Sequence, residues 1–341
     1  MKKMLLVSIL IPLYNSEKYI AKTIDSALAQ TYENTEILIF DDGSTDNSLS
    51  IASKYESKYE NVKVFTHDNR GAQVTRNKLF ELSSGTYIQY LDADDLLDKN
   101  KIKNQMLALK GTDYKTIAFS KCSDFEGENL NFAVLQQLSI YKNYDDPIRL
   151  LIDMWTKFEP LAPHAWLVSR KLLSEVGDWN LTLTKNQDGE FFARVISKSK
   201  KVVFVAEALI YYRLDSQSSI SKNMSYQAMK SILLSFGSYG QIVKQSKNTG
   251  ELKLALARQY SNFMFLIYPS QRTLFIEAEQ KLKQLGFDSP VPIRDSNWIY
   301  ILHSVIGGKM SIKVLKFVKI ILHSTFPKFR KRNRQHYKID N

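Results

Sequence analysis

The chain has 341 residues, of which 44% are hydrophobic and 24% are charged. This composition excludes a disordered or fibrous protein and predicts a globular one with a substantial buried core. The single cysteine, Cys122, excludes an internal disulfide and a cysteine-based metal cluster, which favours a reducing compartment such as the cytosol.

The net charge of +12 is concentrated near the C-terminus. Residues 296–341 hold ten lysines and arginines against one acid, Asp340, and so carry +9 of that total. The rest of the chain is close to neutral. We therefore expect any basic partner surface to lie in this tail.

The N-terminal apolar run after Met1-Lys2-Lys3 superficially resembles a secretory signal. Polar residues and Pro12 interrupt it, however, and no small-residue cleavage site follows, so it predicts a buried strand. The chain has no uncharged apolar stretch of about 20 residues, so a membrane-spanning helix is not expected.

Strand and helix patterns alternate through the first hundred residues. Apolar runs predict strands at 7–13, 36–40, 62–66 and 86–91, and helical spacing predicts helices at 20–30, 47–58 and 72–82. This alternation predicts an α/β fold with a mostly parallel sheet and helices on both faces. Ligands bind beyond the carboxyl ends of the strands in such sheets, and each acidic cluster described below follows a strand.

The remaining pattern is less regular. Helices are expected at 99–109, 147–156 and 188–197, and strands at 116–120 and 202–205. Residues 225–283 have mainly helical spacing. We expect a first domain over residues 1–220, a helical C-terminal region over 221–300 and a basic tail over 301–341.

Asp92 and Asp94 follow the fourth predicted strand. Because side chains alternate along a strand, we expect both carboxylates on the same side. Two adjacent carboxylates repel unless a cation lies between them, and a hard divalent ion that also binds a diphosphate suits them. The alternative is a solvated acidic turn that caps the next helix.

Two further clusters follow the first two predicted strands. In Asp41-Asp42-Gly43-Ser44-Thr45-Asp46 a carboxylate can accept the ring N–H of a uracil-type base, and the next helix start offers backbone donors. Helix capping by the residues after Gly43 is the simpler explanation. Pro12-Leu13-Tyr14-Asn15 can present an aromatic face and an amide to a base, or it can form only a turn.

Taken together, these segments resemble the family 2 glycosyltransferases with a GT-A fold. The resemblance covers residues 5–220 and rests on 7–15, on 41–46, on Gly71 with Arg76-Asn77, and on 92–95. It implies a nucleotide site in which Asp42 faces the base, Arg76 lies near the diphosphate and Asp92 approaches the ribose or metal. Asp94 would ligate the metal. The other implied nucleotide-binding residues are Pro12, Tyr14, Asn15 and Glu17.

The resemblance also implies a catalytic base at the start of a downstream helix. Asp188 is the expected base, and Glu190 is the alternative, because Gln187 and Gly189 depart from the usual pattern. Arg213 resembles a second phosphate contact, with a strand-edge arginine as the alternative. Trp166 is either a sugar-stacking residue or a core tryptophan.

The implied activity is an inverting, metal-dependent sugar transfer. Its expected parts are a divalent cation (Mn²⁺ or Mg²⁺), a nucleotide-sugar donor, and a hydroxyl of a glycan or lipid-linked acceptor in cell-surface polysaccharide synthesis. The enzyme would be a hexosyl- or N-acetylhexosaminyltransferase, and the resemblance alone favours a UDP-sugar. The alternative is a catalytically inactive nucleotide-sugar-binding or scaffold protein held at the membrane.

The tail contains an amphipathic helical pattern between Lys309 and Leu322. Lysines recur every three or four residues opposite an apolar face formed by Met310, Val314, Phe317, Val318 and Ile321. Such a helix lies in an anionic lipid interface, so the protein is expected to be cytoplasmic and peripheral on the inner face of the membrane. The alternative is a helix packed on the body with solvated lysines. The apolar face argues against nucleic acid as a partner.

Overall fold

The structure is a computed structural model that describes residues 4–216, 223–246, 249–293, 307–315 and 317. Its contacts divide the chain into two compact units. Unit 1 comprises Met1–Pro147, Leu161–Thr182 and Gln187–Ser219, and unit 2 comprises Ile148–Pro160, Leu183–Asn186 and Ile220–Asn341. The domain boundaries expected from the sequence stay a prediction.

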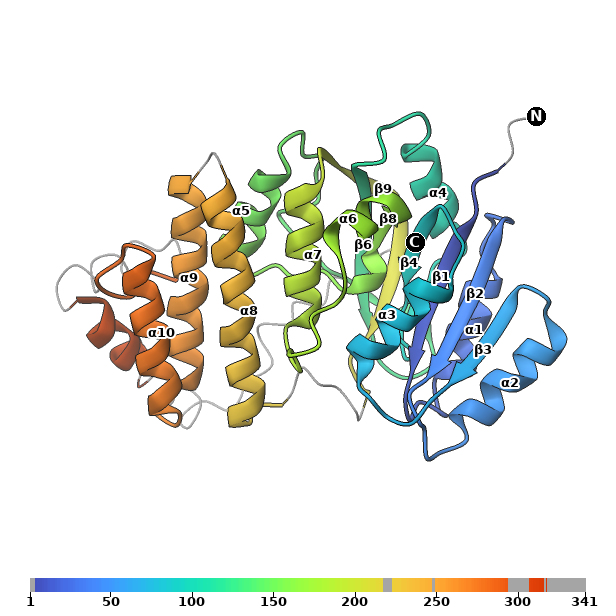
Figure 1. Ribbon diagram of the computed structural model, residues 1–341, viewed down its shortest axis with the longest axis horizontal. Coiled ribbons are helices and arrows are strands. Elements are labelled where there is room, and N and C mark those ends of the chain that lie inside the picture. Colours follow the sequence, from blue (N-terminus) through green and yellow to red (C-terminus); the bar gives the residue numbers. More distant parts are fainter. Residues whose placement is uncertain (1–3, 217–222, 247–248, 294–306, 316, 318–341) are drawn as a thin grey trace. The chain divides into compact units, whose positions relative to one another are not determined.

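Unit 1 is built on one mixed, mostly parallel sheet (Figure 1). The strand order is β3-β2-β1-β4-β8-β6-β9-β5, and β7 pairs with β6. Among the described residues, the strands are β1 (Val7–Leu13), β2 (Thr35–Asp41), β3 (Val62–Thr66), β4 (Tyr87–Tyr90), β5 (Leu96–Leu97), β6 (Thr116–Phe125), β7 (Val134–Leu135), β8 (Trp166–Ser169) and β9 (Lys201–Arg213). Six of the seven β1 residues are buried, which explains why its sequence is a near-continuous apolar run.

Helices cover both faces of this sheet. Helices α1 (Ile20–Leu28) and α2 (Ser48–Lys58) pack beside each other, whereas α3 (Ala72–Leu82) packs on β1 and β2. The chain moves outward from β1 to β2 to β3 and then returns to β4. Right-handed crossovers therefore place α3 on the face opposite α1 and α2, as Figure 1 shows. The strand order reverses between β1 and β4, where open α/β sheets bind ligands.

Strand β9 is longer than the expected 202–205. Val205 pairs with Ser120, and the next paired residue, Leu209, is opposite Lys121, so the intervening residues form a bulge. Ala206 and Glu207 interrupt the apolar run at this bulge, so the sequence pattern does not indicate that the strand continues to Arg213.

Unit 2 contains three long helices: α8 (Tyr226–Gln245), α9 (Thr249–Ile267) and α10 (Arg272–Gln284). They pack side by side (Figure 1), which confirms the helical C-terminal region expected from the sequence. Trp155 of α5 (Pro147–Lys157) stacks on Tyr239 of α8 with ring centroids 4.5 Å apart.

The other labelled helical segments belong to unit 1. They are α4 (Lys101–Ala108), η1 (Leu130–Phe132), η2 (Pro163–Ala165), α6 (Arg170–Val176) and α7 (Gln187–Lys198).

The described part of the tail is helical over 307–315 and at 317. Met310 and Phe317 are exposed, Ile312 is buried, and Lys309 forms an ion pair with Glu279 at 2.6 Å. The rest of the predicted amphipathic segment, including Lys316, Lys319, Val318 and Ile321, lies outside the described residues. Within the described part of the chain, no helix has the length and apolar character needed to cross a membrane.

Candidate active site

Hydrogen bonds join the loops that follow β1 and β2 at the carboxyl edge of the sheet. The backbone N–H of Asn15 donates to Ser44 Oγ at 2.9 Å, and Asn15 Oδ1 accepts the backbone N–H of Thr45 at 2.8 Å. Glu17 Oε2 accepts both the backbone and the side-chain N–H of Asn47, at 3.0 and 2.8 Å. Two predicted nucleotide-binding residues, Asn15 and Glu17, therefore hold the loops in place.

The aromatic ring predicted for the base remains accessible in this arrangement. Tyr14 lies between the interlocked residues and the end of β1, and 46% of its surface is exposed. Pro12 is part of β1 and pairs with Phe40 of β2. Their predicted contact with a nucleotide stays a prediction.

The two acids at the end of β2 have different surroundings. Asp42 Oδ1 and Oδ2 accept the backbone N–H groups of Arg70 and Gly71 at 2.8 and 2.9 Å. Asp41 Oδ2 accepts the backbone N–H of Ser44 at 3.0 Å, whereas Asp41 Oδ1 is buried and has no hydrogen-bond partner among the residues that the structure describes. Asp42 thus anchors the loop after β3, and Asp41 has the buried oxygen that remains able to accept.

Gly43 allows that loop to approach closely. Its φ angle is +72°, a conformation that other residues rarely adopt, and a Cβ atom there would lie 2.7 Å from the backbone nitrogen of Asn69. A side chain at this position would push the loop away from Asp42. The glycine of the motif is therefore required for packing between the two loops.

The acidic cluster after β4 is a turn and not an extension of the strand. Strand β4 ends at Tyr90, and the backbone N–H of Asp95 donates to the carbonyl of Asp92 at 3.2 Å. The expectation that Asp92 and Asp94 share a side because side chains alternate along a strand is wrong for this reason. In the turn, an oxygen of Asp92, one of Asp95 and a ring nitrogen of His164 lie within 4.8 Å of one another.

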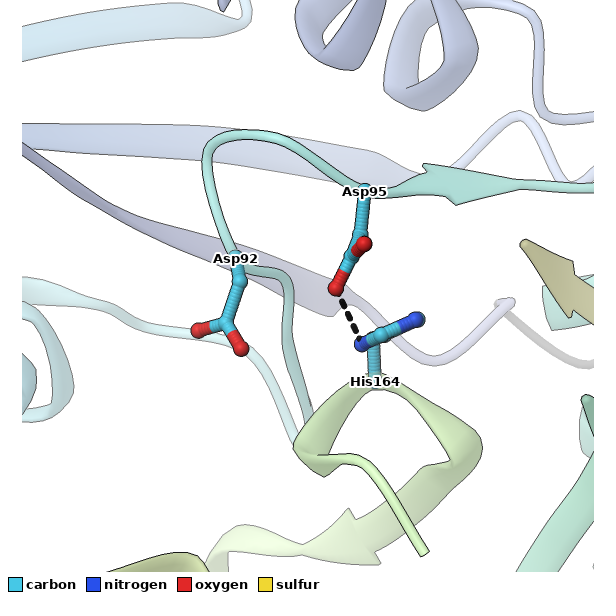
Figure 2. Close-up of side chains that lie close together, drawn as sticks. All are labelled: Asp92, Asp95 and His164. Carbon is cyan, nitrogen blue, oxygen red and sulfur yellow. Dashed lines mark ion pairs between the residues drawn. The ribbon is translucent and has the colours of Figure 1, made fainter. Parts of the chain in front are cut away.

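Figure 2 shows this group, with Asp95 directed at His164 from the turn and His164 rising from η2. His164 Nδ1 lies 3.5 Å from Asp95 Oδ2, and neither ring nitrogen makes a hydrogen bond within the described part of the chain. Burial lowers the pKa of His164 to about 4, so the ring is neutral at pH 7. A neutral imidazole beside a carboxylate has the donor chemistry of a metal ligand.

The charges of the turn also favour a cation. Burial raises the pKa of Asp94, and the nearby charge of Asp92 raises it further. Burial, followed by the charges of Asp94 and Asp92, holds the pKa of Asp95 well above its usual range. Three crowded carboxyl groups beside the neutral imidazole of His164 therefore fit a divalent cation. The assignment of Asp94 as the ligand stays a prediction.

Arg213 braces the turn from β9. Its backbone N–H donates to Asp95 Oδ1 at 2.7 Å, and its Nε donates to the carbonyl of Asp94 at 3.0 Å. The guanidinium also donates to the carbonyl of Gly127 at 2.7 Å, and only 1% of the side chain is exposed. These contacts give Arg213 a structural role, and its predicted phosphate contact stays a prediction.

Arg76 of α3 connects the acidic turn to α7. Its Nη2 donates to Asp92 Oδ1 at 2.7 Å, and its Nη1 lies 3.7 Å from Asp188 Oδ1. The residue is 4% exposed, and Nε and Nη1 have no hydrogen-bond partner among the described residues. A buried guanidinium with two nitrogen donors that the described residues leave unpaired can bind an anion.

The two candidate bases on α7 differ in their partners. Glu190 is buried and forms a bidentate pair with Arg194 at 2.8 and 3.0 Å. Asp188 keeps 36% of its side chain exposed, while its Oδ1 is buried and has no hydrogen-bond partner in the described part of the chain. Burial raises the pKa of Asp188 to about 6, with Asp92 adding to the shift and Arg76 opposing it. This geometry favours Asp188 over Glu190 as a proton acceptor.

Trp166 lies in the core of unit 1. It is 1% exposed, stacks on Phe192 with ring centroids 5.3 Å apart, and contacts Phe119 in a tilted arrangement at 5.4 Å. This packing corresponds to the core alternative, and sugar stacking by Trp166 stays a prediction.

Sequence reasoning missed Asp41 as the acid with an unpaired oxygen, His164 beside Asp95, and Trp179 beneath Arg76. The doubled acid before Gly43 was a signal for Asp41, but it did not indicate which oxygen lacks a partner. His164 and Trp179 are far from their partners in sequence, so no local spacing marks them.

Comparison with protein families and known proteins gives a consistent match. The model of Glycosyl transferase family 2 matches residues 8–177, about half of the chain. An uncharacterized glycosyltransferase of Haemophilus influenzae is 41% identical over 102 residues, which are 30% of this chain and 41% of the relative. An uncharacterized glycosyltransferase of Rickettsia felis is 30% identical over 236 residues, 67% of this chain and 38% of the relative. The chain thus spans less than half the length of either relative.

A solved structure shares the fold. The crystal structure of S. aureus TarS 1-349 in complex with UDP-GlcNAc aligns with a TM-score of 0.62 at 19% identity and covers 82% of this chain and 81% of that chain. At this identity the likeness concerns the fold alone. It confirms the expected mostly parallel sheet flanked by helices, followed by a helical C-terminal region.

Proposed function

The chain belongs to glycosyl transferase family 2, and on that premise we propose that it transfers a sugar from a UDP-sugar to an acceptor hydroxyl with inversion at the anomeric carbon. The transferred group would be a hexosyl or N-acetylhexosaminyl group. The acceptor would be a glycan or a lipid-linked precursor in cell-surface polysaccharide synthesis.

One observation carries this proposal: Arg76 lies between Asp188 and Asp92 within unit 1. The guanidinium is 2.7 Å from Asp92 and 3.7 Å from Asp188. A candidate base and the acidic turn are thus held on either side of one buried cation. An inverting transfer needs a proton acceptor and positive charge for the leaving diphosphate within reach of the same bound sugar, and this site offers both.

Asp188 would act as the general base. Its pKa of about 6 leaves it ionised at pH 7 yet basic enough to take the proton of the attacking hydroxyl. The acceptor oxygen bonds to the anomeric carbon as the bond from that carbon to the diphosphate breaks, and the proton moves to Asp188. A single displacement of this kind inverts the configuration.

Arg76 would stabilise the leaving group through Nε and Nη1, which have no hydrogen-bond partner among the described residues. Asp94 and Asp92 would hold Mn²⁺ or Mg²⁺, and Asp95 and His164 lie close enough to Asp92 to contribute further ligands. When bound, such a cation supplies positive charge to the diphosphate oxygens. Arg213 would keep the turn in place through its bonds to Asp95 and Asp94.

The choice of uridine rests on two supports. The related fold of TarS holds UDP-GlcNAc. In this chain, the buried Asp41 Oδ1 has no hydrogen-bond partner within the described ranges and can accept the ring N–H that uracil has and cytosine lacks. The predicted role of Asp42 at the base would be indirect, through the loop that it anchors.

The proposed location is the cytoplasmic face of the membrane, with the basic tail on anionic lipid. Its support is the charge of +9 over 296–341 together with the exposed Met310 and Phe317. Co-sedimentation with vesicles of phosphatidylglycerol, compared with vesicles of phosphatidylcholine alone, tests it. Equal binding to both vesicles, or no binding to either, would contradict the electrostatic part of the proposal.

Calorimetric titration with UDP, GDP, CDP and dTDP, each with Mn²⁺ and again with a chelator, tests the donor site. We expect UDP to bind most tightly, and we expect the chelator and Asp94→Ala each to abolish binding. Asp145→Ala is the matched control, because that carboxylate is 87% exposed and pairs only peripherally, with Lys201 at 2.8 Å. If no nucleotide bound under either condition, an inactive scaffold protein would become the better description.

A further inference from the structure

We propose that Trp179 is a positioning residue that fixes the plane of the Arg76 guanidinium, and through it the direction of the donors that face the diphosphate. This inference rests on the proposed function of the Arg76 site. It adds a residue that no motif marks and that lies 103 positions from Arg76 in the sequence.

The guanidinium lies on the indole. Arg76 Cζ is 4.6 Å from the ring centroid of Trp179, and the two residues are 4% and 2% exposed. A desolvated contact of a cation with an aromatic face is stronger than an exposed one, and a planar guanidinium stacks parallel to the ring. The face of Trp179 therefore limits how Arg76 can turn.

The indole is itself held in place. Phe191 of α7 stacks on it with centroids 4.0 Å apart and an interplanar angle of 7°, and Tyr90 meets its edge at 5.2 Å. Because Phe191 covers one face at this distance, the other face is left for Arg76. The ring thus joins the end of β4, which leads into the turn of Asp92, to α3 and α7, which carry Arg76 and Asp188.

The backbone of Trp179 is pinned to the same helix that carries Arg76. Asn77 Nδ2 donates to the carbonyl of Trp179 at 3.2 Å, and the backbone N–H of Trp179 donates to Asn77 Oδ1 at 2.8 Å. Asn77 therefore holds the main chain of Trp179, and the preceding residue, Arg76, packs on its ring. This gives the Arg76-Asn77 pair a physical role beyond the phosphate contact.

Hydrogen bonding alone does not fix the guanidinium. Among the described residues, one hydrogen bond, from Nη2 to Asp92, holds it, whereas Nη1 is 3.7 Å from Asp188 and Nε has no partner. A group held at one nitrogen can still swing about that contact. The stack on Trp179 supplies the second constraint, which aligns Nη1 and Nε before a donor binds.

Two variants test this inference. Trp179→Leu removes the aromatic face, and Trp179→Phe keeps a smaller one, so Phe should rescue what Leu loses. Phe119→Leu is the matched control: Phe119 is fully buried in unit 1 and makes tilted ring contacts with Trp166 and Phe204. It reports the effect of losing a core ring that does not support Arg76.

The first measurement needs no ligand. In nitrogen-edited NMR spectra of arginine side chains, the Nε–H signal of Arg76, identified by its loss in Arg76→Lys, should be shifted by the ring current of Trp179 in the wild type. We expect Trp179→Leu to remove that shift and Phe119→Leu to preserve it. An unchanged signal in Trp179→Leu would refute the positioning role, whatever the activity of the protein.

The second measurement is UDP affinity in the presence of Mn²⁺. We expect Trp179→Leu to weaken binding by roughly tenfold or more, the size of a desolvated cation–π contact, and Trp179→Phe to stay within about threefold of the wild type. Equal losses in Trp179→Leu and Phe119→Leu would overturn the inference. Failure of the wild type to bind UDP would refute the proposed donor site, while the NMR result would still decide the positioning of Arg76.

Discussion

Replacement of Asp188 by Asn separates the proposed base from the donor site. The amide keeps the shape of the carboxylate but cannot take a proton from the acceptor, and general-base catalysis contributes roughly 10² to 10⁴ in rate. Donor binding should change little, because Arg76 is hydrogen-bonded to Asp92 at 2.7 Å but lies 3.7 Å from Asp188. At 3.7 Å the two groups are not hydrogen-bonded, and the Asp188 side chain is 36% exposed, so we expect its loss to change UDP affinity by no more than about fivefold.

The assay is release of UDP from UDP-sugars in the presence of p-nitrophenyl glycosides as acceptors, with UDP affinity measured in parallel. We expect Asp188→Asn to lose at least about a hundredfold in kcat with UDP affinity within about fivefold of the wild type. Asp145→Asn is the control, since it removes one exposed acid of unit 1. Retention of more than about a tenth of the turnover by Asp188→Asn would refute the assignment of the base.

The pH profile gives a second test of the same residue. Because burial raises the pKa of Asp188 to about 6, the wild-type kcat/KM should fall as the pH drops below about 6 and the base becomes protonated. The residual activity of Asp188→Asn should lack this inflection. A wild-type profile that stays level down to pH 4.5 would mean that another group accepts the proton.

Three further variants test other parts of the site. Asp41→Asn should weaken binding of UDP and dTDP relative to CDP by about tenfold or more in calorimetry, because an amide replaces the carboxyl group that would accept the ring N–H. Equal losses for all three nucleotides would contradict base reading by Asp41. Glu190→Gln should lower the free energy of unfolding by about 1 to 3 kcal/mol in urea titration with turnover near that of the wild type, since it breaks the pair with Arg194; a larger loss of turnover than in Asp188→Asn would make Glu190 the base. Gly43→Ala should destabilise the protein by about 1 to 3 kcal/mol through its φ of +72° and the contact with Asn69, and unchanged stability would show that the two loops can separate without loss.

The parallel half of the sheet could be predicted because its signals are local. The strand at 7–13 and the strand at 62–66 agree with β1 and β3, and the helix at 72–82 agrees with α3. Each is an apolar run or a helical repeat bounded by turn residues, so neighbouring residues determine it. The short strands β5 and β8 were not expected. Leu96–Leu97 pairs with β9, and Trp166–Ser169 pairs with β4 and β6, so both depend on distant partners.

The candidate site shows the same division. The sequence identified the acidic turn and the helix start that carries Asp188, because both are compact motifs. It could not show that Arg213 braces the turn, since the bond to Asp95 joins residues 118 positions apart. It also treated Asp92 and Asp94 as strand neighbours, although the chain already turns after Tyr90. The role of each of these residues depends on which of its hydrogen-bond donors and acceptors already have partners within the protein.

The same distinction determines which substitutions can test nucleotide binding. Asn15 and Glu17 hold the loop that follows β2, so removing either side chain leaves backbone donors of that loop without partners and changes its stability as well as any affinity. Loss of nucleotide binding in such variants would therefore not identify a ligand contact. Tyr14 is the better probe, because 46% of its surface is exposed between the same loops. None of the described hydrogen bonds that join these loops involves its ring. A loss of UDP affinity in Tyr14→Ala at unchanged stability would show that its ring contacts the base.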